Sequence, residues 1–260
     1  MELYVTVLGS GSSGNSVLIS YGNYGILIDA GFSRKEILNR MTTAGINHEL
    51  VKSIFVTHEH TDHVKGLRVL GEYLDATTYT TSDVLSLLKE RNLINKKTKI
   101  FQSGTKFNLY DFVIRPFSVP HDATDPVCFT FTVGDTKIGY AMDLGHLNNV
   151  AVSALHDSNV LLIECNHDLT MLRNSDRPIS LKQRIAGKHG HLNNVEAIES
   201  FSLLVTEKTH HIMLGHISNE CNRHEIIMEL ASKKLKSMNR EDINLSLMYQ
   251  DHPSSPILAG

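Results

Sequence analysis

The chain has 260 residues, 41% of them hydrophobic, so it is long enough to bury the core of one large domain or two small ones. Its formal charge is only −3, so any surface for a nucleic acid must be a local patch. The wide, unequal spacing of Cys128, Cys165 and Cys221 argues against a disulfide framework or a thiolate zinc site and predicts buried free thiols.

The start of the chain, residues 1–8, lacks the basic region and the cleavage site of a signal peptide and instead predicts a first strand. No run approaches the roughly 18 apolar residues that a membrane span needs. No low-complexity linker divides the sequence. We therefore expect a soluble, cytoplasmic protein with a single domain over residues 1–260 and no membrane contact.

In the first half of the chain, a strand at 4–8 leads into a flexible loop at 9–16 that is rich in glycine and serine. Gly22-Asn23 predicts a hairpin turn between two strands, and Ser33 with Glu36 predicts a capping box that begins a helix ending near Ala44. The other expected elements of this half are strands at 53–57 and 77–81 and helices at 64–73 and 82–91.

In the second half, Gly134-Asp135 predicts a turn between two strands. The strands are expected at 111–117, 127–133, 136–142, 159–164, 209–215 and 243–249. The helices are expected from Leu169 onward and at 181–187, 194–205 and 222–236. Each half combines strands with flanking helices, which indicates a mixed α/β (α+β) fold.

One short motif, His58-Glu59-His60-Thr61-Asp62-His63, contains three imidazoles and two carboxylates. In an extended segment His58 and His60 share one face, because side chains alternate, while Asp62 and His63 begin the next turn. A solvated polar loop is the alternative interpretation, but ligand-type residues this dense need cations to balance them. We therefore predict that this loop holds two adjacent metal ions.

Four more ligand-type residues each follow an apolar run, namely Asp29, His121, Asp143 and His216. In layered α/β architectures, strand ends deliver polar groups to a common edge while the strands themselves stay apolar. Several separate strands can thus contribute one ligand each to a shared site.

The motif resembles the HxHxDH signature of the metallo-β-lactamase superfamily, and the later His, Asp and His follow in the superfamily order. The resemblance covers roughly the whole chain and implies a four-layer αββα sandwich. The ligands that it implies are His58, His60 and His121 for one metal ion, Asp62, His63 and His216 for the other, and Asp143 as the bridge. For Asp29 it implies an orienting role beside the motif loop, and a purely structural turn role is the alternative.

The ligand set suits Zn²⁺, Mn²⁺ or Fe, and no thiolate favours zinc. Two such ions about 3.5–4 Å apart can bridge a water, lower its pKa toward about 7, and neutralise charge on the attacked and leaving oxygens. The resemblance therefore implies a hydrolase with two divalent metal ions per chain. An Asp at position 143 fits the phosphodiesterase and glyoxalase branches better than a β-lactamase, where a Cys would be expected.

The superfamily acts on lactams, thioesters, lactones and phosphodiesters, so the metal ligands alone do not select a substrate. Residues 169–191 contain five basic residues against one acidic residue, which favours a phosphate backbone, although a solvated helix face is the alternative. The expected substrate contacts are Arg177, Lys182 and Arg184, with Ser12 and Asn15 from loop 9–16. Glycines in that loop let backbone N–H groups approach phosphate, but a plain turn is the alternative.

Residues 9–16, 164–168 and 190–194 resemble segments of the WalJ (YycJ)-type nucleases, a bacterial branch of the superfamily. The resemblance implies a DNA-degrading 5′→3′ exonuclease, with Asp62 and His191 as catalytic residues and Glu164 supporting the metal ligands. In related phosphodiesterases the His corresponding to His191 lies near the scissile phosphate, where it can bind an oxygen or protonate the leaving O3′. A histidine at a helix start is the alternative. Family members usually have Ser where this chain has Asn193.

The residues are also compatible with other functions. A small-molecule hydrolase acting on a cyclic nucleotide, thioester or lactone is the enzyme alternative, and a binding module without turnover is disfavoured by the complete ligand set. An RNA-processing nuclease is weakened, because the 72 residues between Asp143 and His216 are too few for a β-CASP cap domain and no Gly- and Pro-rich arm is present. We expect DNA rather than RNA as the partner, and no pattern indicates a protein partner.

Overall fold

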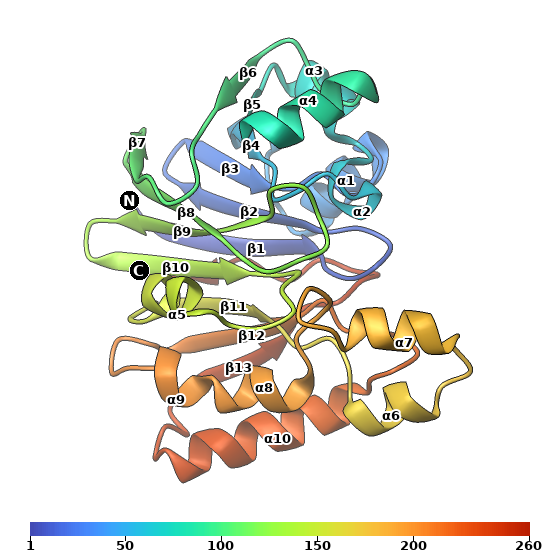
Figure 1. Ribbon diagram of the computed structural model, residues 1–260. Helices are drawn as coiled ribbons and strands as arrows, with labels where there is room; N and C mark the ends of the chain where they lie inside the picture. Colours follow the sequence, from blue (N-terminus) through green and yellow to red (C-terminus); the bar gives the residue numbers. More distant parts are fainter. The chain divides into compact units, whose positions relative to one another are not determined.

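A computed structural model describes all residues, 1–260, and the chain forms two compact units. The first unit consists of residues 1–116, 123–127 and 249–260, and the second of residues 117–122 and 128–248. Neither unit is a simple half of the sequence, because each takes in a segment from the other half of the chain. Figure 1 traces the elements of each unit in chain order.

The first unit is built on a seven-stranded sheet with the order β14-β1-β2-β3-β4-β5-β6. Its strands are β1 (Leu3–Gly9), β2 (Ser16–Tyr21), β3 (Tyr24–Ile28), β4 (Val51–Phe55), β5 (Thr77–Thr80), β6 (Thr98–Ile100) and β14 (Ile257–Leu258). The first three strands form an antiparallel meander with the predicted turn at Gly22-Asn23, whereas β3 to β6 are parallel. Parallel strands end at one edge of the sheet, so the loops after β3 and β4 emerge side by side.

The helices of the first unit cover the apolar face of this sheet. They are α1 (Arg34–Thr43), η1 (His48–Leu50), α2 (Thr61–Val64), α3 (Leu67–Leu74) and α4 (Ser82–Glu90). The predicted cap is present, since the Ser33 hydroxyl accepts the Glu36 N–H at 3.3 Å. The core includes Leu27 and Ile54 from the sheet, packed with Ile37 and Leu67 from the helices.

The single helix predicted at 64–73 is instead divided into α2 and α3, with Gly66 between them. The Gly66 N–H donates to the Ala30 carbonyl, and a Cβ at this position would lie 2.1 Å from the carbonyl oxygen of Phe32. Only glycine permits this close backbone approach, and it fixes α2 beside the end of β3. The hairpin β7 (Phe107–Leu109) and β8 (Phe112–Ser118) follows later in the chain.

The second unit contains the strand order β13-β12-β11-β10-β9. These strands are β9 (Val127–Val133), β10 (Thr136–Ala141), β11 (Val160–Glu164), β12 (His211–Gly215) and β13 (Asn244–Leu247). The β9–β10 pair is the predicted hairpin, and β10 to β13 are parallel. The loops after β10, β11 and β12 therefore leave the same edge of the sheet.

Six helices belong to the second unit, and α10 packs against α8 and β13 (Figure 1). They are α5 (Asn149–Leu155), α6 (Leu169–Asn174), α7 (Ile179–Ile185), α8 (Asn194–Glu199), α9 (Phe201–Leu204) and α10 (His224–Ser237). The helix predicted at 194–205 is interrupted at Ser200, which separates α8 from α9. No helix of the chain is both long and apolar enough to cross a membrane.

Candidate metal centre

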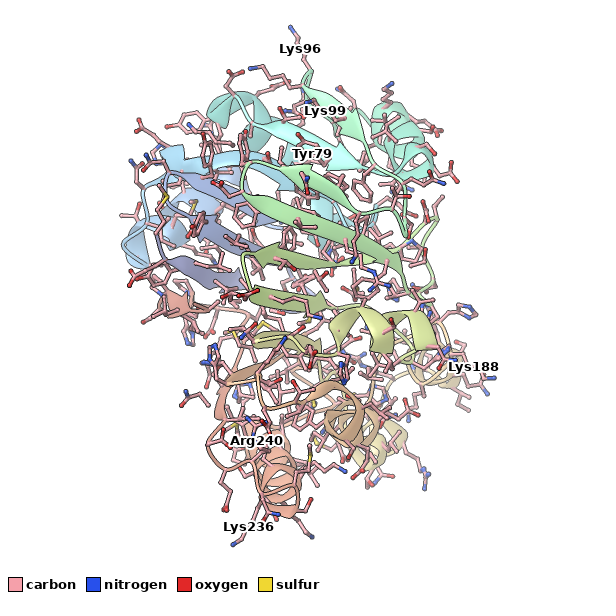
Figure 2. All side chains as sticks on the ribbon, turned by 90° about the vertical axis from the view of Figure 1, so that its left-hand side faces the viewer. Tyr79, Lys96, Lys99, Lys188, Lys236 and Arg240 are labelled. Carbon is pink, nitrogen blue, oxygen red and sulfur yellow. The ribbon has the colours of Figure 1, made fainter.

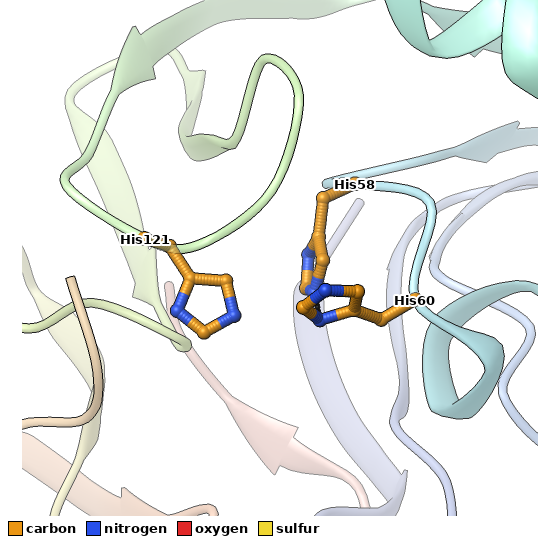
Figure 3. Close-up of side chains that lie close together, drawn as sticks. All are labelled: His58, His60 and His121. Atoms are coloured by element: carbon orange, nitrogen blue, oxygen red, sulfur yellow. Dashed lines mark hydrogen bonds between the residues drawn. The ribbon is translucent and has the colours of Figure 1, made fainter. Parts of the chain in front are cut away.

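The HxHxDH loop leaves the end of β4 and enters α2. His60 keeps an extended backbone, and the His58 Nε2 atom lies 3.1 Å from His60 Nδ1, with the two rings meeting edge to face (Figure 3). Two nitrogens on one tetrahedral Zn²⁺, each about 2.0–2.1 Å from the ion, are roughly 3.3–3.4 Å apart. The donor atoms of His58 and His60 are therefore spaced to share one cation.

Asp29 lies at the end of β3 and is completely buried beneath the motif loop. Its Oδ1 accepts the Thr57 N–H at 2.9 Å, and its Oδ2 accepts the Thr57 hydroxyl at 2.8 Å and lies 2.7 Å from His63 Nδ1. Burial raises the pKa of Asp29, and the contacts with His63 and Thr57 offset this only in part. A carboxylate on Nδ1 sets the ring orientation, so Nε2 is the nitrogen that His63 would offer to a metal.

Asn15 is 1% exposed, and its side chain forms hydrogen bonds to other residues of the first unit. Its Nδ2 donates to the Gly11 carbonyl and contacts Asp62 Oδ2 at 3.3 Å and His63 Nε2 at 3.1 Å. The polar atoms of Asn15 are thus engaged with the loop and with the metal-ligand candidates, and a substrate contact of Asn15 stays a prediction. Ser12, in contrast, is exposed on the same loop.

Asp62 lies in the first turn of α2, where its side chain is 25% exposed. Its backbone carbonyl accepts the Asn15 N–H at 2.8 Å, and a Cβ on the neighbouring Gly31 would lie 1.7 Å from that oxygen. Gly31, two residues after Asp29, is therefore required for the close packing of the chain around Asp62.

In the second unit, Asp143, Glu164, His191 and His216 bring four possible ligand atoms within 4.8 Å of one another. Glu164 organises this group: its Oε1 lies 2.7 Å from His191 Nδ1 and 2.9 Å from His216 Nδ1, and its Oε2 accepts the Leu144 and Leu192 N–H groups. Burial would raise the pKa of Glu164, but the charges and hydrogen bonds of His191 and His216 outweigh burial and lower it to about 2. The carboxylate is thus ionised and orients both imidazoles.

His191 is partly exposed, with 23% of its side chain accessible, and its Nδ1 also lies 3.4 Å from Asp143 Oδ1. Burial lowers the pKa of His191, but Glu164 and Asp143 raise it above its usual value overall. His191 lies two residues before Asn193, which caps α8 by accepting the Glu196 N–H at 3.0 Å, so His191 itself does not cap the helix.

His121 follows β8 on a loop of the second unit (Figure 3). Its Nδ1 donates to the Gly190 carbonyl at 3.0 Å, and burial lowers its pKa despite the nearby Asp143. A neutral imidazole with Nδ1–H bonded to a backbone carbonyl presents Nε2 as the ligand atom. The donor chemistry in both units therefore fits divalent cations held by imidazole and carboxylate.

Three predicted site residues share a strained backbone. Asp29, Asp143 and His216 have φ angles of 60°, 56° and 52°, and they lie one or two residues beyond the ends of β3, β10 and β12. Residues other than glycine rarely adopt positive φ, and such strain concentrates at functional sites. No sequence pattern indicated this shared conformation.

A network of buried asparagines beside His216 was not predicted from the sequence. The Asn166 Nδ2 donates to the His216 carbonyl at 2.7 Å, which fixes the strained residue. Asn222 Nδ2 in turn contacts the carbonyls of Cys165 and Asn166 and the side chain of Asn194. Asn166 and Asn194 belong to segments that carried the family resemblance, but Asn222 is 56 residues from Asn166 and 28 from Asn194 and lies in no recognised motif.

The basic residues predicted to bind substrate are engaged with neighbouring groups. Arg177 pairs with Glu220 at 2.9 Å, Arg184 pairs with Asp122, and Lys182 Nζ donates to the Arg173 carbonyl at 2.8 Å. Two of these contacts cancel charge, so the positive charge counted along residues 169–191 overstates the local field. Contact of Arg177, Lys182 and Arg184 with substrate stays a prediction.

Comparison with known proteins gives matches along nearly the whole chain. The model of the Beta-lactamase superfamily domain matches residues 24–217. Exodeoxyribonuclease YycJ of Bacillus anthracis is 32% identical over 98% of this chain and 97% of its own length. Exodeoxyribonuclease WalJ of Streptococcus pneumoniae is 30% identical over 96% of this chain and 94% of its own length.

Solved structures show the same fold at lower identity. The metallo-β-lactamase fold protein YhfI from Bacillus subtilis has a TM-score of 0.73 at 16% identity and covers 98% of this chain and 100% of its own. Unliganded yeast PDE1 has a TM-score of 0.68 at 12% identity, with full coverage of both chains.

Proposed function

The chain belongs to the β-lactamase superfamily and to its YycJ/WalJ-type branch, and from this premise we propose that it degrades DNA as a 5′→3′ exonuclease with two divalent metal ions. Membership makes the chain a metal-dependent hydrolase. One observation supports DNA as the substrate: both relatives are named exodeoxyribonucleases, and each aligns with at least 96% of this chain. The direction of degradation rests on the family resemblance.

We assign the metal ligands as the family pattern implies. The first ion would be held by His58, His60 and His121 and the second by Asp62, His63 and His216, and Asp143 would be the ligand that they share. When bound, a pair of Zn²⁺, Mn²⁺ or Fe ions supplies Lewis-acid chemistry and an activated water. The contacts of Asp29 with His63 and of Glu164 with His216 support this assignment, because carboxylates behind ligand histidines fix the ligating nitrogen.

We assign His191 to the scissile phosphate. Glu164 and Asp143 stabilise its protonated form, so the ring can donate a hydrogen bond to a phosphate oxygen or a proton to the O3′ oxygen as the P–O3′ bond breaks. Its partial exposure leaves the ring accessible to substrate. Asp62, also partly exposed, would orient the attacking group beside the metal ligands.

The proposal is tested with duplex DNA labelled at either the 5′ or the 3′ end, alongside single-stranded DNA, RNA and bis(p-nitrophenyl) phosphate, in Mn²⁺ or Zn²⁺. We expect the 5′ label to appear at once as a mononucleotide and the 3′-labelled strand to shorten progressively. Asp143→Ala should be inactive on every substrate. Hydrolysis of the small ester without any degradation of DNA would contradict the proposal, and release of the 3′ label first would contradict its direction.

A further inference from the structure

The most basic part of the first unit is a segment that we call the basic segment, residues 89–106. It contains six of the 25 Lys and Arg residues of the chain but only one of the 28 Asp and Glu residues. The rest of the chain therefore has 19 basic and 27 acidic residues. The basic residues of the segment are Lys89, Arg91, Lys96, Lys97, Lys99 and Lys106.

The charges of the basic segment are largely uncompensated. Lys97 pairs with Asp75 at 2.5 Å, but the other five basic side chains form no ion pair, and all five residues are exposed. This contrasts with Arg177 and Arg184, which are both paired with carboxylates. The larger uncancelled charge is thus on residues 89–106, not on residues 169–191.

The basic segment follows the open edge of the first sheet. Its central strand is β6, which pairs only with β5, and Figure 2 shows Lys96 extending outward there and Lys99 beside Tyr79. The Lys99 Nζ lies 5.9 Å from the centre of the Tyr79 ring, at the outer limit of a cation–π contact, and the residue as a whole is exposed. Lysines also protect edge strands from pairing with other chains, but a three-residue strand offers little edge to protect.

One contact joins the basic segment to the motif loop. Arg91 Nη1 donates to the Glu59 carbonyl at 3.4 Å, and Glu59 lies between His58 and His60. The Glu59 carboxylate also accepts the Thr124 hydroxyl at 2.8 Å, which holds this part of the loop in place. A cationic surface thus begins directly beside two metal-ligand candidates.

We propose that the basic segment is the surface that binds the phosphate backbone of DNA where the substrate extends beyond the metal ligands. Duplex DNA carries one negative charge per about 1.7 Å of its axis, so an otherwise acidic protein needs a concentrated cationic surface to hold it. A small ester would not reach past the metal ligands and needs no such surface. This inference rests on the proposed function and identifies the part of the chain that recognises its substrate as a polyanion.

The test compares two variants of equal charge. The first replaces Lys96, Lys99 and Lys106 with Gln, and the control replaces Lys52, Lys233 and Lys236, three exposed lysines outside the basic segment. Binding of a fluorescent duplex with uncleavable phosphorothioate linkages is measured by anisotropy across a range of salt concentrations. Hydrolysis of bis(p-nitrophenyl) phosphate by each variant reports whether the fold and the metal ligands remain intact.

We expect the first variant to bind DNA more weakly. The magnitude of the negative slope of log K against log salt should fall by about 0.9 for each phosphate contact removed. Hydrolysis of the small ester should be unchanged. The control should keep the wild-type slope. An unchanged slope in the first variant, or equal losses in both variants, would overturn the inference while leaving the proposed function intact. If the wild-type protein hydrolyses the ester but neither binds nor degrades DNA, the proposed function itself fails.

Discussion

At the residue scale, the candidate site depends on buried carboxylates that contact the Nδ1 atoms of histidines. Asp29 holds His63, and Glu164 holds both His191 and His216. Each contact uses Nδ1, so all three rings are fixed with Nε2 as the remaining donor atom. Glu164 is the most connected of these groups, because two backbone N–H groups also stabilise its ionised form.

We predict that His191→Ala lowers turnover on DNA by roughly 10²–10⁴-fold, the usual scale for a general acid, without changing metal content. The reason is that Glu164 still contacts His216 through the same oxygen after the imidazole is removed. Single-turnover kinetics and elemental analysis of the purified variant measure the two quantities. Loss of metal would show instead that His191 is a ligand or a scaffold residue.

At the element scale, polar caps define the helices that carry the site. Asp168 Oδ1 accepts the Thr170 and Met171 N–H groups at the start of α6, and Asn193 caps α8 just after His191. Asn193 stands where family members usually have Ser, and both residue types are strong helix N-caps. The departure from the family pattern therefore preserves the capping function and does not require a hydroxyl contact with substrate.

We predict that Asn193→Ala destabilises the protein by about 1 kcal/mol, whereas Asn193→Ser changes stability by only a few tenths of that amount. Urea unfolding midpoints measure the difference, with Asn174→Ala, an exposed residue at the end of α6, as the control without a cap. Turnover of Asn193→Ser should equal that of the natural chain. A marked gain in turnover with Ser would mean that the hydroxyl contacts substrate after all.

At the scale of the whole molecule, the family match and the solved structures establish the metallo-β-lactamase sandwich. Each unit delivers ligand-type residues from strand ends, with Asp29 and the motif loop in the first unit and His121, Asp143 and His216 in the second. Under the proposed assignment, both units contribute ligands, so the metal content must be measured on the complete chain.

We predict two divalent metal ions per chain after reconstitution with Zn²⁺ or Mn²⁺, measured by elemental analysis. Asp143→Ala should reduce the metal content and abolish activity, because it removes the shared ligand. His156→Ala, which changes an exposed histidine outside the candidate site, should keep both ions. One equivalent in the natural chain, or a fully active Asp143→Ala protein, would be incompatible with the bridged pair.

The family, the ligand-type residues and most of the element types could be predicted from the amino-acid sequence alone. The HxHxDH motif and the polar residues after apolar runs are local patterns, and period-two alternation and capping residues are local as well. Elements with too few residues to show a period were missed, including β6, β7 and β14. Two predicted helices were broken in the structure, because backbone contacts at Gly66 and the turn at Ser200 outweigh helical periodicity.

Which side chains are available for binding became clear only from the folded chain. Asn15 proved to be buried against Asp62 and His63, and Arg177 and Arg184 proved to be paired with acidic residues remote in sequence. Charge counted along a chain cannot reveal such pairs, because Coulomb interactions depend on distance in space. The same reason leaves the strained backbone of His216 and its support by Asn166 invisible until the chain is folded.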